Sequence, residues 1–328
     1  MSDATTEIRA GGFIGLGDQG LAMATAIAEA GYELHVWARR PQSLQALSDT
    51  PHVAHNTVAE LGAACDVVGL CVSTDDDVLR LASGELLGAM RPGAVIVNHG
   101  TGLPRNAMQL AELAAEHGVD ALDAPVSGGR PAAQARTLTT LVGAPEDVVE
   151  CCTPLFEAFA AHVVRSGNTG AGQIAKLFNN ALLMVNQAAI ADVVTLGIKA
   201  GIDPVALVEG LKLGSATSAA LTLLNTMVTP DTVEHLSSVE ALDMDIFDQA
   251  MRDAGVTAES TTERGLSGAN RLPELIARLN PRAPASRTPR SQPTRRPWSS
   301  SSYASAKAAT AAGGKRWELA SQTTPLST

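Results

Sequence analysis

A glycine-rich run near the start of the sequence has the spacing of a nucleotide-binding turn. It follows apolar residues 12–14, precedes the alanine- and leucine-rich residues 21–30, and consists of Gly15, Leu16, Gly17, Asp18, Gln19 and Gly20. In Gly-x-Gly-x-x-Gly the first glycine makes a tight turn, the second lets a pyrophosphate approach, and the third allows close helix–strand packing. N–H groups at the start of the next helix then face the anion. The run predicts a dinucleotide site; the alternative is a flexible glycine-rich turn.

Two arginines follow the second predicted strand, residues 34–38. Arg39 and Arg40 stand where NAD-preferring sites usually carry an acid that accepts hydrogen bonds from the ribose hydroxyls. A guanidinium instead pairs with a 2′-phosphate through charge-assisted hydrogen bonds. We therefore expect NADP as the cofactor, with NAD also possible. The alternative is that both arginines are solvated residues opening the next helix.

A serine and two glycines follow another predicted strand, residues 119–123. Ser127, Gly128 and Gly129 can hold a carboxylate, because glycines let backbone N–H groups point at an anion without interference from a Cβ atom. Their place after a strand is the end of the sheet where such folds bind ligands. The alternative is an ordinary β-turn.

Lys176 and Asn180 are one helical turn apart and share a helix face. The neighbours of Lys176 are mainly apolar, so partial desolvation would lower the pKa of its amine toward values useful for general acid–base catalysis. The alternative is a lysine that lays its apolar stem along a domain interface and keeps its charge in water.

The elements that must position these residues alternate between strand and helix up to residue 167. Such alternation predicts an α/β, Rossmann-type doubly wound parallel sheet. The expected strands are 12–14, 34–38, 67–72, 94–98, 119–123 and 137–142. The expected helices between them include 21–30, 41–49 and 105–117.

After residue 167 the strand-like runs end and the apolar spacing becomes helical. The expected helices are 171–200, 204–211, 218–227 and 239–254. We therefore predict a cofactor-binding domain at 1–167, an all-α substrate and dimerisation domain at 168–280, and a hinge near 166–172. Residues 281–328 are rich in Pro, Ser and Arg, and are expected to form a disordered basic tail.

Composition restricts the classes of protein to which the chain can belong. The 328 residues, 45% of them hydrophobic, fit about two globular domains. Outside the basic tail the chain is strongly acidic, which disfavours nucleic-acid binding. The four cysteines lack a Cys-x-x-Cys pair, and the histidines lack ligand spacing, so no metal is expected. No basic, apolar leader or uncharged span is evident, so we expect a cytoplasmic protein without a membrane segment.

Three separated motifs together resemble the β-hydroxyacid dehydrogenase family, and specifically its 3-hydroxyisobutyrate dehydrogenase and tartronate semialdehyde reductase branch. They are the glycine fingerprint at 15–20, residues 123–129 followed by 137–139, and residues 170–172 leading into 176–180. The resemblance covers residues 12–278. It implies a fold like that of 6-phosphogluconate dehydrogenase and hydride transfer between NAD(P) and a small hydroxy acid.

The resemblance also implies a role for each matching residue. Lys176 would be the catalytic acid–base group, and Asn180 would orient the substrate. Ser127, Gly128 and Gly129 would bind the substrate carboxylate. Thr101 would lie near nicotinamide and substrate, and the third strand would be followed by two residues lining the cofactor cleft, namely Val72 and Ser73.

The sequence departs from the family pattern in three places. Residues 98–101 read Asn-His-Gly-Thr where the family has Asp-x-Ser-Thr. Met244 aligns with a usual lysine, while Asp245 matches the acid after it. Homologous chains continue with helices where residues 281–328 begin, and a frameshift-like replacement would explain that difference.

Three functions stay open on the sequence alone. The first is an NADP-preferring dehydrogenase that interconverts a small hydroxy acid and its semialdehyde or keto form. The second is an imine reductase on the same scaffold, against which the retained Lys176 argues. The third is a catalytically impaired NADP-binding interaction protein. An apolar helical domain makes a homodimer the expected assembly.

Overall fold

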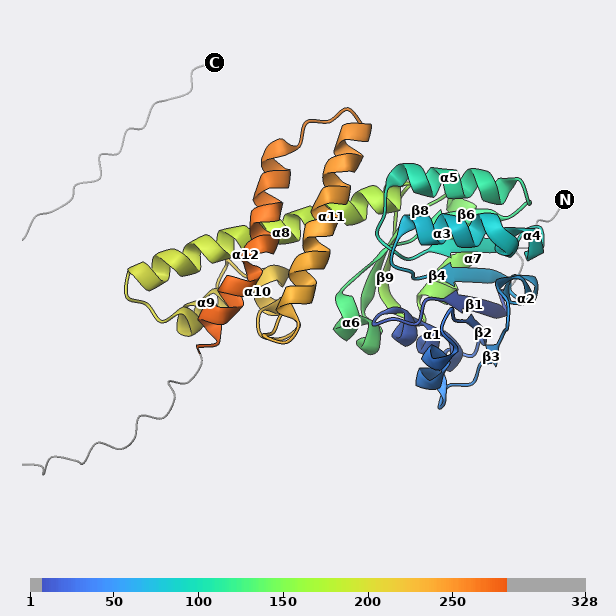
Figure 1. Cartoon of the computed structure of the whole chain (residues 1–328), viewed down its shortest axis with the longest axis horizontal. Helices are drawn as coiled ribbons and strands as arrows, with labels where there is room; N and C mark the ends of the chain where they lie inside the picture. The colour runs from blue at the N-terminus through green and yellow to red at the C-terminus, as the bar shows by residue number, and fades with distance from the viewer. Residues whose placement is uncertain (1–7, 282–328) are drawn as a thin grey trace, which may run out of the picture. The chain divides into compact units, whose positions relative to one another are not determined.

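The computed structural model of the chain describes residues 8–281, and its sheet begins as a doubly wound parallel array. Six strands follow the order β3-β2-β1-β4-β5-β6, all paired in parallel (Figure 1). The order reverses between β1 and β4, which is where sheets of this type bind ligands. The strands are β1 (Ala10–Ile14), β2 (Glu33–Trp37), β3 (Val53–Ala54), β4 (Val67–Leu70), β5 (Val95–Asn98) and β6 (Asp120–Asp123).

Three further strands extend the sheet beyond β6. These are β7 (Val126–Ser127), β8 (Leu138–Gly143) and β9 (Ala160–Gly167). Strand β8 pairs antiparallel with β6 and β7, and parallel with β9. The sequence analysis missed β3, β7 and β9. Two of them have only two residues, and β9 is mostly exposed, so their pairing rather than an apolar period defines them.

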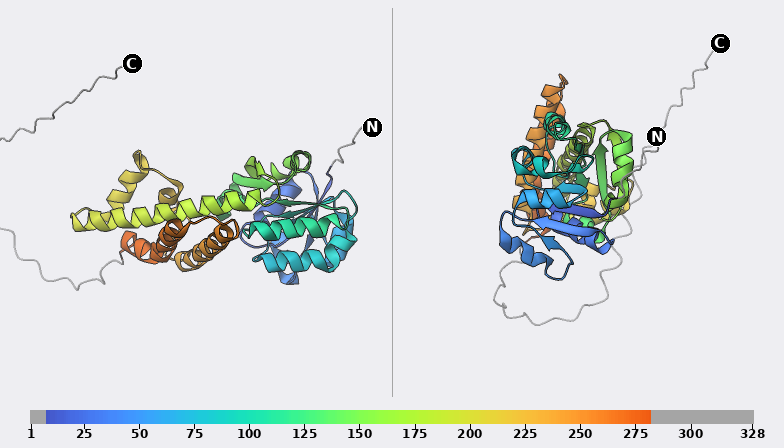
Figure 2. Two further views of the ribbon diagram at one scale, coloured as in Figure 1. Left: turned by 90° about the horizontal axis from the view of Figure 1, so that it is seen from above. Right: turned by 90° about the vertical axis from the view of Figure 1, so that its right-hand side faces the viewer.

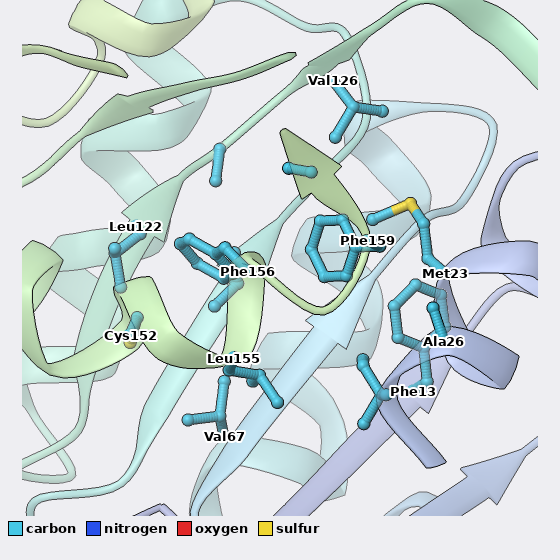
Figure 3. Packing of buried hydrophobic residues seen from close by; sticks show 14 of the residues in the cluster. Phe13, Met23, Ala26, Val67, Leu122, Val126, Cys152, Leu155, Phe156 and Phe159 are labelled. Carbon is cyan, nitrogen blue, oxygen red and sulfur yellow. The ribbon is translucent and has the colours of Figure 1, made fainter. Parts of the chain in front are cut away.

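Helices cover both faces of the sheet, as predicted (Figure 2). Adjacent residues of a strand face opposite sides, so Phe13 packs into one core and Ile14 into the other. The Phe13 core receives residues from α1 (Gly20–Glu29), α6 (Gly129–Ala135) and α7 (Glu146–Phe156) (Figure 3). The Ile14 core receives residues from α2 (Val58–Ala64), α3 (Asp75–Leu81) and α5 (Pro104–Ala115).

The helix predicted at 41–49 is wrong in type. The chain forms a 3₁₀ helix there, η1 (Pro41–Leu47), and only Leu47 of that helix is buried. Pro41 favours the first helical turn. With only one buried side chain, the segment has no apolar face whose packing would stabilise an α-helix. A second irregular segment, η2 (Ala82–Leu86), kinks at Gly84 and leads into α4 (Leu87–Ala89).

The rest of the described chain is helical, as predicted. The helices are α8 (Ala171–Lys199), α9 (Pro204–Leu213), α10 (Ala219–Leu223), α11 (Val233–Asp253) and α12 (Glu259–Leu279). The helix predicted at 218–227 ends early, because Asn225 adopts a left-handed conformation and Leu224 bridges to Val228. The helix predicted at 239–254 begins six residues earlier, at Val233.

The sequence analysis missed α12 entirely. Its glycines and Pro273 break the usual helix signals. The structure explains Gly268, because a Cβ atom there would lie 1.9 Å from the carbonyl oxygen of Met184 on α8. Glycine therefore permits the close approach of α12 to α8.

Helix α8 is long and apolar enough to cross a membrane by length and composition. It packs against α11 and α12, and 44% of its most apolar 18-residue window is buried. Asp192 on this helix pairs with Arg264 and Arg271 of α12. These contacts are those of a core helix.

Two predicted boundaries concern the ends of this helical part. The predicted hinge, 166–172, spans the end of β9 and the start of α8. The predicted disordered tail, 281–328, lies outside the described residues apart from Pro281.

Candidate active site

The predicted cofactor residues meet in a cleft of about 310 Å³ where β1, β2 and β4 end. Seven of them line it: Gly15, Leu16, Gly17, Arg39, Arg40, Val72 and Ser73. The sequence analysis missed several other lining residues, including Trp37, Ser43, Asp77 and Arg80. Trp37 ends β2, whereas Ser43 lies in η1 and Asp77 and Arg80 lie in α3, the elements that follow β2 and β4.

The three fingerprint glycines have different surroundings, and these fit a bound dinucleotide. Gly15 has φ +102°, and a Cβ atom there would lie 2.2 Å from the Cys71 carbonyl oxygen. A Cβ atom on Gly20 would lie 1.9 Å from the Gly15 carbonyl oxygen. A Cβ atom on Gly17 would meet nothing within 4 Å, so the backbone there faces open space in the cleft. Gly17 thus leaves room for a pyrophosphate at the start of α1.

Not every predicted cofactor residue lines this cleft. Asp18 instead lines a neighbouring cleft of about 620 Å³ between α1 and α6, where it pairs with Arg130 at 3.8 Å. Gln19 caps α1 without a side-chain hydrogen bond, and Gly20 is buried in its first turn. Their contribution is to shape the turn.

The adenosine end of the cleft is rich in cationic groups. Arg39 and Arg40 are exposed there, and Arg80 pairs with Asp77 on α3. The Asp77 carboxylate is thus paired with Arg80, while Arg39 and Arg40 line the cleft as exposed residues. This arrangement can hold a phosphate on the ribose.

Thr101 lies in a loop that α8 holds in place. Gln173 is buried, donates to the Gly100 carbonyl oxygen at 2.8 Å and accepts from the Gly102 N–H at 2.8 Å. Asp75 accepts the Leu103 N–H on the other side of the loop. Because Gln173 precedes Lys176 by three residues, this clamp brings Thr101 to the same end of α8.

A buried carboxylate joins β6 to the start of α8. Asp123 accepts the N–H groups of Gly170 and Gln173 at 2.7 and 2.8 Å. Burial raises the pKa of Asp123 to about 6, against the lowering effect of these hydrogen bonds. The carboxylate satisfies otherwise unpaired helix N–H groups and fixes the helix that carries Lys176.

Two of the predicted substrate residues, Ser127 and Asn180, are joined through Asn179 into a polar cluster at α8. The Asn179 side chain donates to the Ser127 hydroxyl at 3.3 Å and to the Asn180 side-chain oxygen at 3.0 Å. Gly128 and Gly129 follow Ser127, both with positive φ. Lys176 is half-buried one turn before Asn180. Ser127 and α8 are thus adjacent, although about fifty residues separate them.

Desolvation lowers the pKa of Lys176, while the charge of Asp243 opposes that shift. Asn180 donates to the Asp243 carboxylate at 2.8 Å. The sequence analysis missed Asp243, because the contact crosses from α8 to α11. Asp245, matched there to the family's acid, is exposed. Met244 is fully buried against Gly265 of α12, so the position aligned with a family lysine does not face the cluster.

Within residues 8–281, no three His, Cys, Asp or Glu side chains gather as a metal site would require.

Two family models match consecutive parts of the chain. The NAD binding domain of 6-phosphogluconate dehydrogenase matches residues 11–170. The NAD-binding domain of NADP-dependent 3-hydroxyisobutyrate dehydrogenase matches residues 170–264. The two matches meet at Gly170, the residue before α8.

Curated proteins and solved structures are similar to the same region. NAD-dependent L-serine dehydrogenase of Pseudomonas aeruginosa is 35% identical over 215 residues, 65% of this chain and 72% of the relative. 2-(Hydroxymethyl)glutarate dehydrogenase of Eubacterium barkeri is 34% identical over 212 residues, 64% of this chain and 70% of the relative. Mycobacterium tuberculosis 3-hydroxyisobutyrate dehydrogenase, solved with L-serine, has a TM-score of 0.72 at 26% identity, covering 82% of this chain and 94% of that one.

Proposed function

Because the chain belongs to the β-hydroxyacid dehydrogenase family, we propose that it interconverts a short 3-hydroxy acid and its semialdehyde, with NADP as the preferred cofactor. It is an NAD(P)-dependent oxidoreductase of the 3-hydroxyisobutyrate dehydrogenase type. One observation carries the proposal: a half-buried lysine lies one helical turn before Asn180, which Asn179 joins to a serine followed by two positive-φ glycines.

The named substrates of the relatives have a common core. L-Serine, 3-hydroxyisobutyrate and 2-(hydroxymethyl)glutarate each carry a carboxylate and a CH₂OH group on one carbon atom. They differ in the third substituent of that carbon. Ser127 and the backbone of Gly128 and Gly129 are suited to bind the shared carboxylate, and Lys176 to receive the hydroxyl proton.

The residues of this chain would divide the work as follows. Bound NADP accepts the hydride that leaves the substrate carbon. Lys176 in its neutral form takes the hydroxyl proton, and desolvation favours that form by lowering the pKa of the amine. Asn180 is held by Asp243 and can orient the substrate beside Lys176. In the reverse direction, the Lys176 ammonium returns the proton to the developing alkoxide.

The preference for NADP rests on the charge at the adenosine end of the cleft. Arg39 and Arg40 line it, and the chain has no carboxylate directly after β2. The carboxylate present, Asp77, pairs with Arg80. A 2′-phosphate thus meets two available guanidinium groups.

Lys176→Ala tests the acid–base role. We expect kcat for 3-hydroxy acids to fall by about 10²–10⁴-fold, the usual contribution of a general acid–base group. Dissociation constants for NADPH and NADH should stay within about twofold of wild type, and NADPH should bind more tightly than NADH. Lys199→Ala, at the exposed end of the same helix, is the matched control and should retain full kcat.

The same experiment separates the other two functions. Wild-type turnover of cyclic imines without turnover of hydroxy acids would support the imine reductase. Tight NADPH binding without turnover of either class would support the interaction protein. An unchanged kcat in a folded Lys176→Ala variant would contradict the role of Lys176.

A further inference from the structure

Asp243 holds Asn180 in the proposed chemistry, but its carboxylate has hydrogen-bonding capacity that this role does not use. Asp243 on α11 is half-buried and contacts Asn180 at 2.8 Å. Within residues 8–281 this is its one hydrogen bond, so it leaves carboxylate capacity for another donor. The charge of Asp243 opposes the lowering of the pKa of Lys176, and Asn180, its hydrogen-bond partner, lies one helical turn after Lys176, so the two groups are close enough to interact.

We propose that Asp243 recognises an ammonium group on the substrate, so that the preferred substrate is a β-hydroxy-α-amino acid. The inference rests on the proposed function, because it takes Ser127 and Lys176 as the binding sites for the carboxylate and the hydroxyl. It assigns the remaining substituent of the same carbon atom.

The charge balance of the cluster favours this class. Ser127, Asn179 and Asn180 are neutral, and Lys176 and Asp243 have opposite charges when ionised, so the five side chains sum to zero when both groups are ionised or both are neutral. Burial raises the pKa of Asp243, and an ammonium group beside it would favour the ionised carboxylate. A zwitterionic amino acid keeps that balance. A simple hydroxy acid adds one negative charge, and a dicarboxylate adds two. In a partly desolvated site, unbalanced charge is costly.

Neighbouring residues of α11 supply no cation, and burial raises the pKa of the Glu240 carboxyl to about 7. Glu240, one turn before Asp243, is buried and bonded to Gln187 at 3.0 Å. Met244, where relatives would place a lysine, points into the contact with α12. Glu240, Asp243 and Met244 therefore offer no cation to an additional substrate carboxylate. An ammonium group, in contrast, would lie beside the Asp243 carboxylate.

The reaction on this substrate balances as the general one does. The C–H electron pair leaves with its hydrogen as hydride to NADP, and the O–H proton passes to Lys176. The C–O single bond becomes a double bond, giving an α-amino semialdehyde. The ammonium group keeps all of its bonds and stays against Asp243.

L-Serine and 3-hydroxyisobutyrate form a matched pair of probes, since a methyl group replaces the ammonium and the rest is unchanged. Binding of each, including both enantiomers of the hydroxy acid, would be measured calorimetrically on the NADPH-loaded enzyme. We expect wild type to bind L-serine at least tenfold more tightly. Asp243→Asn preserves an acceptor for Asn180 but removes the charge. It should lower the ratio of L-serine affinity to 3-hydroxyisobutyrate affinity by at least tenfold.

Asp245→Asn removes an exposed carboxylate from the same helix and should keep the preference. Equal or tighter binding of 3-hydroxyisobutyrate by wild type would overturn the proposal, as would a preference that persists in folded Asp243→Asn. Absence of binding of both compounds would also overturn it. Selective binding of L-serine without its oxidation would leave Asp243 as the ammonium site and contradict the proposed reaction instead.

Discussion

At the scale of single residues, burial sets the ionisation of His99, next to the site. His99 is 4% exposed, donates through Nδ1 to the Ala124 carbonyl oxygen and packs against the rings of Phe13, Phe156 and Phe159. Burial lowers the pKa of His99 to about 4. The imidazole is therefore neutral at pH 7, directly before the loop that carries Thr101.

The buried imidazole predicts a loss of stability in acid. Because the pKa of His99 is lower in the folded chain than the ordinary 6.5, its contribution is complete above pH 6.5 and is lost as the pH falls to about 4. The His99 contribution to the free energy of unfolding should fall by about 3 kcal/mol. Asp123 and Glu240, whose pKa values are raised to about 6 and about 7, act in the opposite direction over the same range. The His99 contribution is therefore measured as the difference between wild type and His99→Leu in chemical denaturation between pH 4 and 7.

His99→Leu should be less stable than wild type at pH 7, because the Ala124 carbonyl loses its partner. As the pH falls to 4, the variant should gain about 3 kcal/mol relative to wild type, because it has no imidazole to protonate. His117→Leu, at an exposed histidine, should show no such gain. A difference between His99→Leu and wild type that stays constant from pH 7 to pH 4 would contradict the prediction.

At the scale of elements, the junction of β6, β8 and α8 places the lysine helix on the sheet. A Cβ atom on Gly172 would lie 2.5 Å from the Leu141 carbonyl oxygen and 2.7 Å from that of Asp123. A Cβ atom on Gly143 would lie 2.5 Å from a carboxylate oxygen of Asp123. Backbone therefore packs directly on backbone where α8 begins.

We expect Gly172→Ala to lower the free energy of unfolding by about 1–3 kcal/mol, because rigid backbone must move to accommodate one methyl group. Gly210→Ala is the matched control in the interior of α9, where a Cβ atom meets nothing within 4 Å. It should raise stability by about 0.5–1 kcal/mol, since alanine favours the helix. Equal effects of the two substitutions in denaturant titrations would contradict this account.

At the scale of the whole molecule, α8 keeps large apolar side chains exposed after α11 and α12 have packed on it. Phe178, Leu182 and Leu196 are 51%, 62% and 63% exposed. An apolar surface of this kind is typical of an interface between protein chains. We propose that this surface forms the interface of the expected homodimer.

We expect light scattering after gel filtration to give the mass of two chains at micromolar concentration. Leu196→Glu should shift the mass to that of one chain, because it places a charge on the apolar surface of α8. Val256→Glu, at another exposed apolar residue, serves as the control and should stay dimeric. A single-chain mass for wild type would contradict the proposal.

Local signals in the sequence determined the family, the α/β sheet and the helical part. The fingerprint from Gly15 to Gly20 is six consecutive residues, and Lys176 and Asn180 share one helix, so neighbouring residues suffice to recognise them. Short or exposed strands such as β9 were not predicted, because strand pairing rather than a side-chain pattern forms them. Helix α12 was not predicted, because its glycines, which weaken the helix signal, serve packing against α8.

Only the tertiary structure decided what surrounds the predicted lysine. Asn180 meets Asp243 across 63 positions of the chain, and Gly102 meets Gln173 across 71. The sequence matched Asp245 to the family's acid, yet helical rotation turns Asp243 toward Asn180 and leaves Asp245 exposed. Which face of α11 meets α8 depends on the packing of three helices, and no local pattern of residues records that choice.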